Sequence, residues 1–325
     1  MSLENQLIFL AGSTGLAGSS ILEYLVQNYP ETKIRAIYHK RMPFFRHNQI
    51  EYVQGDLTSI EDCKKLADGC DCAIMAAAYT GGAGFVRSFP LDHVNENLLM
   101  IIQMLRAFHL KQVKRVVYIG SATLYQDFEG CIKEEELDLN RNPHEAYFGF
   151  GWMVRFIEKL CCLLHEQDGT ELVVARAANI FGPYANFDPK TSNFIPAIIR
   201  KAVEKMDPFE VWGTPDVTRD VIYTSDFAKA IVLMADDDKI KFDTFNVGSG
   251  MKTTVGDVVH WVLQYARHHP DEIKYLQDRP TTMKFRVLDC TKLKETLGWK
   301  PEYTIEEGIK KTVEWWIENR NWWNK

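Results

Sequence analysis

A short apolar run followed by three spaced glycines constrains the fold of this 325-residue chain more than any other stretch. Leu7–Ala11 is apolar throughout, which is typical of a strand buried on both faces of a parallel sheet. Gly12, Gly15 and Gly18 follow directly, and apolar residues then recur at helical spacing over 21–26. Glycines in such a loop let the backbone approach a pyrophosphate at the positive end of the helix. The pattern therefore predicts a dinucleotide-binding loop, and a purely structural turn is the alternative.

The alternation of strand and helix continues through the first half of the chain. Apolar, strand-like runs cover 33–38, 50–54, 72–78 and 113–119, and a helical pattern covers 95–109. Strands and helices that alternate at these lengths indicate a doubly wound parallel sheet, so we predict an α/β fold of that class.

The end of the second predicted strand carries basic residues where a fold that prefers NAD usually carries an acid. The chain reads Tyr38-His39-Lys40-Arg41 there. Two cations suit the 2′-phosphate of NADP, so we predict NADP rather than NAD, with a solvated basic loop as the alternative. The predicted cofactor-binding residues are Gly12, Thr14, Gly15, Leu16, Gly18, Lys40, Arg41, Asp56, Leu57, Ala76, Ala77, Ala78 and Asn95.

The composition limits the classes of partner. The net charge of −6 and a pI near 5.9 argue against nucleic acid as the main partner. No apolar run reaches about 18 residues, so we expect no membrane span, and residues 1–6 lack the basic start of a signal peptide. The seven cysteines have no metal-like spacing, which predicts reduced thiols, no metal site and a cytoplasmic location.

Several motifs beyond the glycine loop carry a resemblance to one family. They lie at 81–86, 120–125, 179–189, 194–197, 211–213, 218–223 and 245–250. With these motifs the chain resembles the extended short-chain dehydrogenase/reductases of the NAD-dependent epimerase/dehydratase family, which act on nucleotide sugars. Within that family it is most similar to the GDP-L-fucose synthases and, second, to the GDP-mannose 3,5-epimerases. The resemblance covers nearly the whole chain.

The resemblance implies roles for individual residues. Ser121 matches the serine that hydrogen-bonds the sugar at the carbon of hydride transfer, and Asn179 borders the sugar and the nicotinamide. Arg219 matches the arginine that grips the diphosphate of the nucleotide sugar, with a surface ion pair to Asp220 or Asp226 as the alternative. The predicted substrate-binding residues are Gly84, Phe85, Asn179, Asn193, Lys201, Trp212 and Arg219.

Members of this family carry a tyrosine and a lysine four residues apart on one helix, and this chain lacks both. The lysine holds the nicotinamide ribose and favours ionisation of the tyrosine phenol, which exchanges a proton with the substrate oxygen. The run from Phe150 to Cys161 resembles the family sequence in register, so Phe150 and Val154 occupy the two positions. A competing register takes Tyr147 as the acid, with Gly151 at the lysine position. In a third version Tyr147 reaches the substrate from the loop before the helix.

Two further departures change the predicted chemistry. GDP-L-fucose synthases invert sugar carbons with a cysteine and a histidine. Thr123 and Asn193 stand in those places here, which argues against GDP-L-fucose synthesis itself. Ser121 and Thr123 also resemble the Ser-Ala-Thr-x-Tyr segment of UDP-galactose 4-epimerases, which indicates chemistry at C4 of the sugar. His93 and His144 are the nearest candidates for a replacement acid, against a structural or surface role for each.

The second half of the chain is less regular and richer in proline and aromatic residues. We predict a dinucleotide-binding domain over 1–180 and a smaller, interleaved substrate domain over 181–325, with segments near 218–250 and 283–290 returning to the first. From the family we expect a homodimer through the helices near 95–109 and 148–165.

The C-terminal segment 309–323 carries four tryptophans. We predict an amphipathic helix whose tryptophans pack against the protein, and a sugar-binding cluster is the alternative. The tryptophans are Trp315, Trp316, Trp322 and Trp323.

Two interpretations of the function stay open. In the leading one, the protein is a reductase or epimerase of a nucleotide sugar, favoured as GDP-linked, in which Ser121, Thr123, Tyr147 or water carries the proton. A version of it is a non-redox enzyme that keeps a tightly bound dinucleotide as a structural element. In the second, it is a catalytically silent protein that binds a nucleotide sugar and a dinucleotide, such as a regulatory partner. The intact glycine loop and Arg219 favour retained binding in both.

Overall fold

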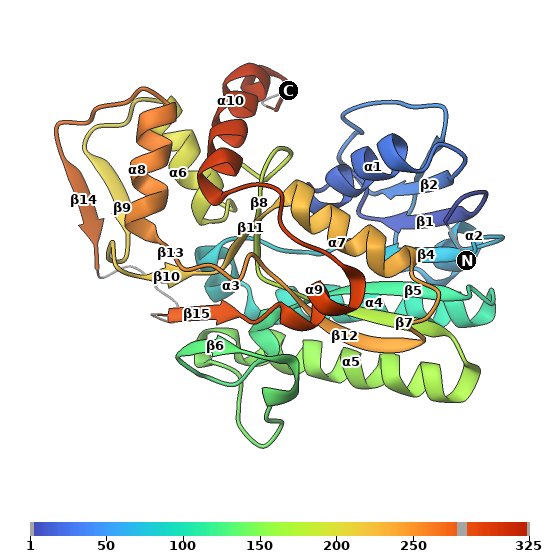
Figure 1. Ribbon diagram of the computed structural model, residues 1–325. Helices are drawn as coiled ribbons and strands as arrows, with labels where there is room; N and C mark the ends of the chain where they lie inside the picture. Colours follow the sequence, from blue (N-terminus) through green and yellow to red (C-terminus); the bar gives the residue numbers. More distant parts are fainter. Residues whose placement is uncertain (1–2, 278–284, 324–325) are drawn as a thin grey trace.

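A seven-stranded parallel sheet forms the centre of the computed structural model, which describes residues 3–277 and 285–323 (Figure 1). Every neighbouring pair of strands in this sheet runs parallel. The predicted α/β, doubly wound fold is confirmed. In spatial order the strands are β12 (Phe242–Val247), β7 (Glu171–Ala177), β5 (Arg115–Ser121), β4 (Cys72–Met75), β1 (Leu7–Ala11), β2 (Lys33–Tyr38) and β3 (Ile50–Gln54).

The first three predicted strands match the structure residue for residue, and two later ones differ at their ends. The predicted strand over 72–78 is too long, because β4 ends at Met75. Ala76 still donates its backbone N–H to the Ala11 carbonyl at 3.2 Å, and the chain then leaves the sheet. β5 begins at Arg115 rather than at residue 113, and it continues to Ser121. Strand ends therefore bring both the small residues after β4 and the serine after β5 to one edge of the sheet.

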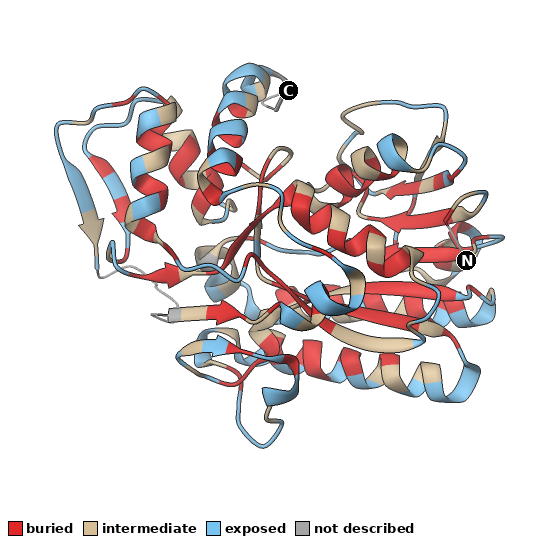
Figure 2. Ribbon diagram, in the orientation of Figure 1, coloured by how far each residue is buried: buried red, intermediate tan, exposed pale blue. Residues whose placement is uncertain are grey.

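Helices cover both faces of the sheet. On one face α1 (Leu16–Asn28) packs beside α7 (Thr224–Asp236). On the other face α4 (Pro90–Leu110) packs beside α5 (Phe148–Asp168) and α2 (Ile60–Leu66). In Figure 1 α7 lies above the sheet, and α4 and α5 lie below it. The central strands between these layers are buried (Figure 2), which is why their sequences are apolar without alternation.

A second, smaller apolar cluster fills the rest of the molecule. It is built mainly from α6 (Phe194–Val203), α8 (Val255–Tyr265), α10 (Ile305–Trp323), β9 (Phe209–Trp212) and β14 (Ile273–Leu276). The larger cluster takes in α7, β12 and buried residues from Leu288 to Trp299, although these lie late in the sequence. The domain division near residue 180 stays a prediction, and the two clusters are the observation that supports it.

The C-terminal helix packs as its sequence predicts. Trp316 is 4% exposed, and its ring stacks on that of Phe187 with the ring centroids 3.9 Å apart. Trp315 contacts the rings of Phe44 and Tyr184. The side chains of Trp322 and Trp323 lie outside the described residues.

A small sheet joins the two parts of the chain. Its strands are β13 (Thr253–Thr254), β10 (Thr218–Arg219), β15 (Phe285–Leu288) and β6 (Gly130–Ile132), in that order. Nearby, β11 (Val221–Tyr223) pairs in parallel with β8 (Asn179–Phe181). Two short helices, α3 (Ala83–Ser88) and α9 (Thr291–Leu297), complete the described fold. The small sheet places the segments around Arg219 and Leu288 beside the carboxyl end of the central sheet.

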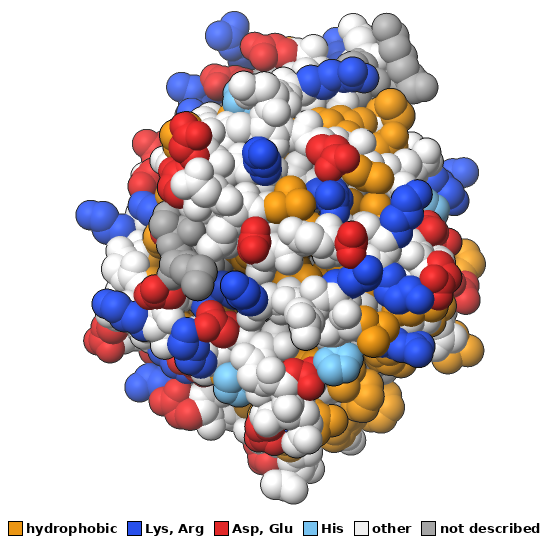
Figure 3. All heavy atoms as spheres, turned by 90° about the vertical axis from the view of Figure 1, so that its right-hand side faces the viewer, with side chains coloured by type: hydrophobic (Ala, Val, Ile, Leu, Met, Phe, Trp, Pro, Cys, Tyr) orange, Lys and Arg blue, Asp and Glu red, His pale blue; other side chains and the backbone are white. Residues whose placement is uncertain are grey.

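The strand order places the crevice of this fold. From β1 the chain adds β2 and β3 on one side of the sheet. It then crosses to the other side of β1, where it adds β4 and β5, so the topological switch point lies between β1 and β4. Ligands of open α/β sheets bind outside the carboxyl ends of the strands at such a point. Figure 3 shows the face that carries the N-terminal strands, where acidic and basic side chains are interspersed. Among the described residues no helix has both the length and the apolar character needed to cross a membrane.

Candidate functional site

The glycine loop packs against the segment that follows β4. Gly12 has a φ of 72°, and a Cβ there would lie 2.6 Å from the Cα of Ala77. A Cβ on Gly18 would lie 2.1 Å from the Gly12 carbonyl oxygen, so α1 starts directly over the loop. Neither position has space for a larger residue. The loop, the start of α1 and the segment after β4 therefore form a backbone cradle of the kind that fits a dinucleotide.

The basic residues after β2 lie in two different environments. Lys40 is exposed. The Arg41 guanidinium lies 4.7 Å from the ring centroid of Phe44 and donates to the Tyr184 carbonyl oxygen at 3.4 Å. Burial lowers the pKa of Arg41 to about 9, so the side chain stays cationic at neutral pH. Of the two predicted phosphate contacts, Lys40 thus faces solvent, whereas Arg41 ties its loop to the segment after β8.

Two other predicted cofactor contacts differ in how the structure places them. Asp56 is exposed at its turn, where its carboxylate accepts the N–H of Thr58 at 2.9 Å and its hydroxyl at 2.6 Å. Asn95 is exposed on α4, whereas Asn97 is 2% exposed. Asn97 accepts the N–H of Tyr79 at 2.9 Å and donates to its carbonyl at 2.8 Å. Asn97 rather than Asn95 therefore shapes the loop after β4, because the phase of the helix decides which asparagine faces inward.

A cavity of about 90 Å³ lies where the ends of β5 and β7 meet β10 and β15. The structure brings together here several residues that the sequence had pointed to separately. It adds Arg286, which no sequence motif had indicated. The lining residues are Ser121, Ala122, Thr123, Tyr147, Ala177, Ala178, Asn179, Arg219, Asp220, Arg286 and Leu288.

The two predicted catalytic hydroxyls touch one another at the end of β5. The Thr123 hydroxyl donates to Ser121 Oγ at 3.0 Å, and the Thr123 N–H contacts the same oxygen at 3.3 Å. A tight turn over Ala122–Leu124 produces this arrangement. Because a hydroxyl both donates and accepts, the pair can hydrogen-bond either a hydroxyl or a carbonyl oxygen of a ligand.

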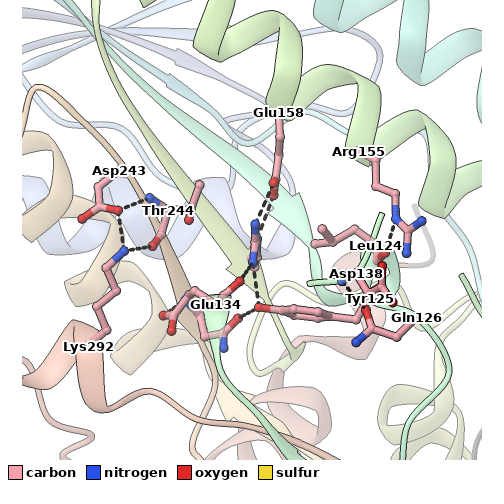
Figure 4. Close-up of polar contacts among 12 residues, drawn as sticks. Leu124, Tyr125, Gln126, Glu134, Asp138, Arg155, Glu158, Asp243, Thr244 and Lys292 are labelled. Carbon is pink, nitrogen blue, oxygen red and sulfur yellow. Dashed lines mark hydrogen bonds and ion pairs between the residues drawn. The ribbon is translucent and has the colours of Figure 1, made fainter. Parts of the chain in front are cut away.

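Two buried arginines hold this turn. Arg155 donates through Nε to the Leu124 carbonyl oxygen at 2.6 Å (Figure 4). Arg176 donates through Nη1 to the Tyr125 hydroxyl at 2.9 Å and makes two hydrogen bonds to Glu158, at 3.0 and 2.9 Å. The turn is therefore fixed by side chains from α5 and β7 as well as by its own hydrogen bonds.

The start of α5 packs tightly on the same turn. A Cβ on Gly151 would lie 2.7 Å from the Thr123 carbonyl oxygen. Val154 is 1% exposed, and its Cγ1 would lie 3.5 Å from a Cβ on Gly120. Val154 thus faces the sheet, whereas Phe150 stacks on His93 of α4, and neither can exchange a proton or hold a ribose hydroxyl. Their assignment to the family's tyrosine and lysine positions stays a prediction, which these contacts support.

The structure separates the candidates for a proton-exchanging group. Tyr147 lines the cavity from a short turn directly before α5, which favours the version in which it acts from the loop. His93 is buried and stacks on Phe150 with ring centroids 4.4 Å apart, and neither of its ring nitrogens has a hydrogen-bond partner among the described residues. The His144 ring accepts the N–H of Ala146 at 3.2 Å. Tyr147 is therefore the candidate that meets Ser121 and Thr123 in the cavity.

Buried charges set the electrostatics of the cavity wall. Burial lowers the pKa of Arg219, and it lowers the pKa of Arg286 to about 10. Burial also raises the pKa of Asp220 to about 6. The Asp220 carboxylate accepts the N–H groups of Leu288 at 3.0 Å and Ser249 at 2.9 Å, so it joins β15 to the loop after β12. The cavity wall therefore contains two cationic side chains and one carboxylate, which accepts hydrogen bonds from backbone N–H groups.

The remaining predicted substrate contacts gather around α3 and the start of α6. A Cβ on Gly84 would lie 3.9 Å from Trp212 Cη2. The Gly82 N–H donates to the Thr191 carbonyl at 2.9 Å, which places the segment with Phe85 beside the loop that ends at Asn193. The predicted contact Lys201 donates to the Glu210 carbonyl at 2.7 Å. In the described part of the chain, none of these predicted contacts lines the cavity.

No group of three or more His, Cys, Asp and Glu side chains in the described residues is placed to hold a metal ion. The polar side chains that line the cavity are two aliphatic hydroxyls, a phenol, an amide, two guanidiniums and a carboxylate.

These features define the class of protein. A parallel sheet with a glycine cradle at its switch point, next to a cavity of hydroxyls and guanidiniums, is a dinucleotide-type fold with a polar substrate site. Residues 8–248 match the model of the NAD dependent epimerase/dehydratase family, and the chain belongs to that family.

Individual relatives extend over most of the chain. The probable GDP-L-fucose synthase 1 of Oryza sativa subsp. japonica is 25% identical over 321 residues, which cover 96% of this chain and 92% of that protein. The GDP-mannose 3,5-epimerase of Arabidopsis thaliana is 26% identical over 268 residues, which cover 80% of this chain and 68% of that protein. The structure of the UDP-glucose 4-epimerase of Thermus thermophilus in complex with NAD matches with a TM-score of 0.81 at 20% identity, covering 96% of this chain and 99% of that one. The family resemblance predicted from the motifs is confirmed.

Proposed function

We propose that this protein is an enzyme of the reductase or epimerase type that acts at or near C4 of a nucleotide sugar, most simply a GDP-sugar. The cavity in which Ser121, Thr123, Tyr147 and Asn179 meet Arg219 carries the proposal. Hydroxyls hydrogen-bond sugar oxygens and exchange protons, and a guanidinium fork suits a diphosphate. One site thus offers groups for both halves of a nucleotide sugar. The family, and relatives named as GDP-L-fucose synthase and GDP-mannose 3,5-epimerase, support it.

The glycine cradle is the proposed dinucleotide site, with NADP preferred over NAD. A bound nicotinamide supplies hydride chemistry at the sugar carbon. Gly12 and Gly18 give the close backbone approach, and Lys40 offers an exposed cation for a 2′-phosphate. Arg41 joins that phosphate site only if it gives up its contact with the Tyr184 carbonyl. The structural neighbour solved in complex with NAD supports a dinucleotide site in this protein. Whether the site prefers NADP, which carries the 2′-phosphate, or NAD, which lacks it, is a question for experiment.

Tyr147 is the group that we assign to proton exchange. Oxidation at a sugar carbon would need a hydride acceptor, which a nicotinamide held in the glycine cradle would supply, and a group of the protein that takes the proton from the hydroxyl on that carbon. Ser121 hydrogen-bonds this hydroxyl, and the proton moves to the oxygen of Tyr147 in its ionised form as the carbonyl forms, which leaves a neutral phenol. Reduction runs through the same groups in reverse. Phe150 and Val154 take no part in these steps.

The first test identifies the nucleotides that the purified protein carries. We expect denatured protein to release NADP or NAD, with or without a GDP-sugar, in mass spectrometry, and we expect NADPH to bind in a calorimetric titration. A released nucleotide sugar without a dinucleotide, together with a failed NADPH titration, contradicts the redox function. That result supports a non-redox enzyme or a binding protein.

A second candidate function, a catalytically silent binding protein, rests on the apolar pair Phe150 and Val154. The two candidates differ in the effect of single substitutions on turnover of GDP-, UDP- and dTDP-hexoses. If the protein is an enzyme, Tyr147→Phe lowers the rate by about 10²–10⁴, as expected for loss of a positioned proton-exchanging group. Ser121→Ala lowers it as well, whereas Phe150→Ala leaves turnover measurable. Tight binding of a nucleotide sugar without turnover of any of these substrates supports the silent protein.

We further infer a cytoplasmic location and a homodimer. All seven cysteines are free thiols, which suits a reducing compartment. The outer faces of α4 and α5 expose large apolar side chains, and the family resemblance implies that such helices pair between two copies.

A further inference from the structure

A second buried arginine reaches the cavity beside Arg219. Arg286 lies on β15, which runs parallel to β10, and the register of the two strands pairs Arg219 with Arg286. Both side chains line the cavity from these neighbouring strands. Arg219 donates through Nη1 to the Thr218 carbonyl oxygen of its own strand at 2.9 Å, and Arg286 donates to the turn after β5.

Arg286 grips the turn that carries the two hydroxyls. Its Nη2 donates to the carbonyl oxygen of Ala122, the residue between the serine and the threonine. The guanidinium also lies 5.7 Å from the ring centroid of Tyr125 and 5.0 Å from that of Phe128. Packing on two rings orients a planar guanidinium, and its rigid fork of five N–H donors lets it hold a carbonyl while it faces a cavity. Arg286 therefore fixes the Ala122 peptide and, through it, both hydroxyls.

Arg286 also acts on the phenol of Tyr147. Tyr147, Arg286 and Arg219 line the same cavity. Burial lowers the pKa of Arg286, and the charge of an ionised Tyr147 opposes this lowering. Tyr147 has the same opposing influence on Arg219. The phenol therefore lies within electrostatic reach of both guanidiniums. A phenol oxygen becomes negative when it releases its proton, and a fixed cation in a partly buried site stabilises that charge.

We propose that Arg286 is a positioning residue of the catalytic site. It holds the Ser121–Thr123 turn through Ala122, and it places beside Tyr147 the positive charge that Val154 does not supply. The inference rests on the proposed role of Tyr147 and names its partner: Tyr147 with Arg286 does the work of the tyrosine and lysine that this chain lacks. Arg219 then keeps its proposed role of binding the diphosphate of the nucleotide sugar.

Nitration of tyrosine by tetranitromethane tests this pairing without substrate or cofactor, because the reagent reacts with the ionised phenol. The rate at Tyr147 is followed by peptide mass spectrometry, with the exposed Tyr79 as the internal reference. In Arg286→Gln we expect the Tyr147 rate to fall by about tenfold, as loss of a nearby cation in a site of intermediate dielectric predicts. Arg286→Lys keeps most of the rate, because it keeps the charge. Equal Tyr147 rates in the wild type and in both variants overturn the proposal.

Steady-state kinetics give an independent readout of the same variants. We expect Arg286→Gln to lower kcat with little change in KM and Arg286→Lys to restore part of kcat, whereas Arg219→Gln mainly raises KM for the nucleotide sugar. An Arg286→Gln protein that melts at the wild-type temperature and keeps the wild-type kcat overturns the proposal. If the wild type turns over no nucleotide sugar, the proposed function fails, and the nitration rates still decide whether Arg286 acts on Tyr147.

Discussion

At the residue scale, two glycines and one aspartate determine what the cleft can hold. Gly12 and Gly18 have no space for a Cβ, because each faces backbone atoms that cannot move without shifting a strand or a helix. Asp220 sits between the two halves of the chain and accepts backbone N–H groups from β15 and from the loop after β12. Each of the three therefore acts on the shape of the cradle or the cavity through the backbone that it contacts.

The steric argument predicts that Gly18→Ala loses dinucleotide binding. A Cβ at 2.1 Å from the Gly12 carbonyl forces α1 away from the loop, and overpacking of this kind costs about 1–3 kcal/mol of unfolding free energy. We expect NADPH affinity to fall and the urea midpoint to drop. Gly15→Ala is the matched control, because its Cβ would lie 3.4 Å from the same oxygen and its stability should stay close to that of the wild type. A Gly18→Ala protein with wild-type stability and affinity contradicts the cradle.

The buried carboxyl group of Asp220 should make the unfolding free energy depend on pH. Burial raises its folded-state pKa to about 6, above the usual value of about 3.9 in the unfolded chain. The folded state therefore binds more protons between these values, so the contribution of Asp220 to stability is full below about pH 4 and is lost as the pH rises through 6. Two pKa units correspond to about 3 kcal/mol. In urea unfolding between pH 4 and 7, Asp220→Asn should remove this downward trend, whereas Glu96→Gln, at an exposed site, should keep it. Equal slopes for the wild type and Asp220→Asn contradict the assignment.

At the element scale, α5 shows what local patterns predict and what they miss. Its apolar spacing predicts a helix, and the structure has it over Phe148–Asp168. The first strands are also readable from local sequence, because a buried parallel strand is a continuous apolar run. Arg286 and Asn97 were missed for a different reason. Their roles come from strand register and from contacts with Ala122 and Tyr79, which lie far away in the sequence or depend on the phase of a helix.

The ion pair between Arg176 on β7 and Glu158 on α5 lies beside the turn that carries Ser121 and Thr123. We expect its loss to cost more unfolding free energy than the loss of any other polar contact there. Arg176 and Glu158 are 5% and 8% exposed, and removing one partner of such a pair leaves a buried charge, which costs about 3–5 kcal/mol. We expect Glu158→Ala to lower the unfolding free energy by that amount and to reduce turnover, because Arg176 also holds Tyr125. Glu61→Ala breaks the exposed pair with Lys64 and should cost less than about 1 kcal/mol. A similar small cost for both variants in guanidinium unfolding contradicts this account.

At the scale of the whole molecule, the outer surface of α4 and α5 exposes large apolar side chains that a single copy of the chain does not bury. Phe156, Leu163 and Leu99 are 52%, 51% and 44% exposed, and neighbouring exposed apolar residues on packed helices favour association. The positions of Phe156 and Leu163, seven residues apart, lie on one side of α5. The family resemblance predicts a dimer that buries both helices, and such a dimer would remove this surface from water.

The double variant Phe156→Glu/Leu163→Glu should therefore convert a dimer into a monomer. Burying two carboxylates in an apolar interface without partners costs far more than the contacts that remain can supply. Light scattering coupled to size exclusion measures the mass directly, and Ile317→Glu, at an apolar position 45% exposed on α10, is the matched control that should stay dimeric. A wild-type protein that elutes as a monomer at all concentrations contradicts the homodimer, and a double variant that stays dimeric places the interface elsewhere. The turn that carries Ser121 and Thr123 packs on the inner face of α5. Because the monomer would lose the support of a partner on the outer face of this helix, we also expect it to have a lower melting temperature.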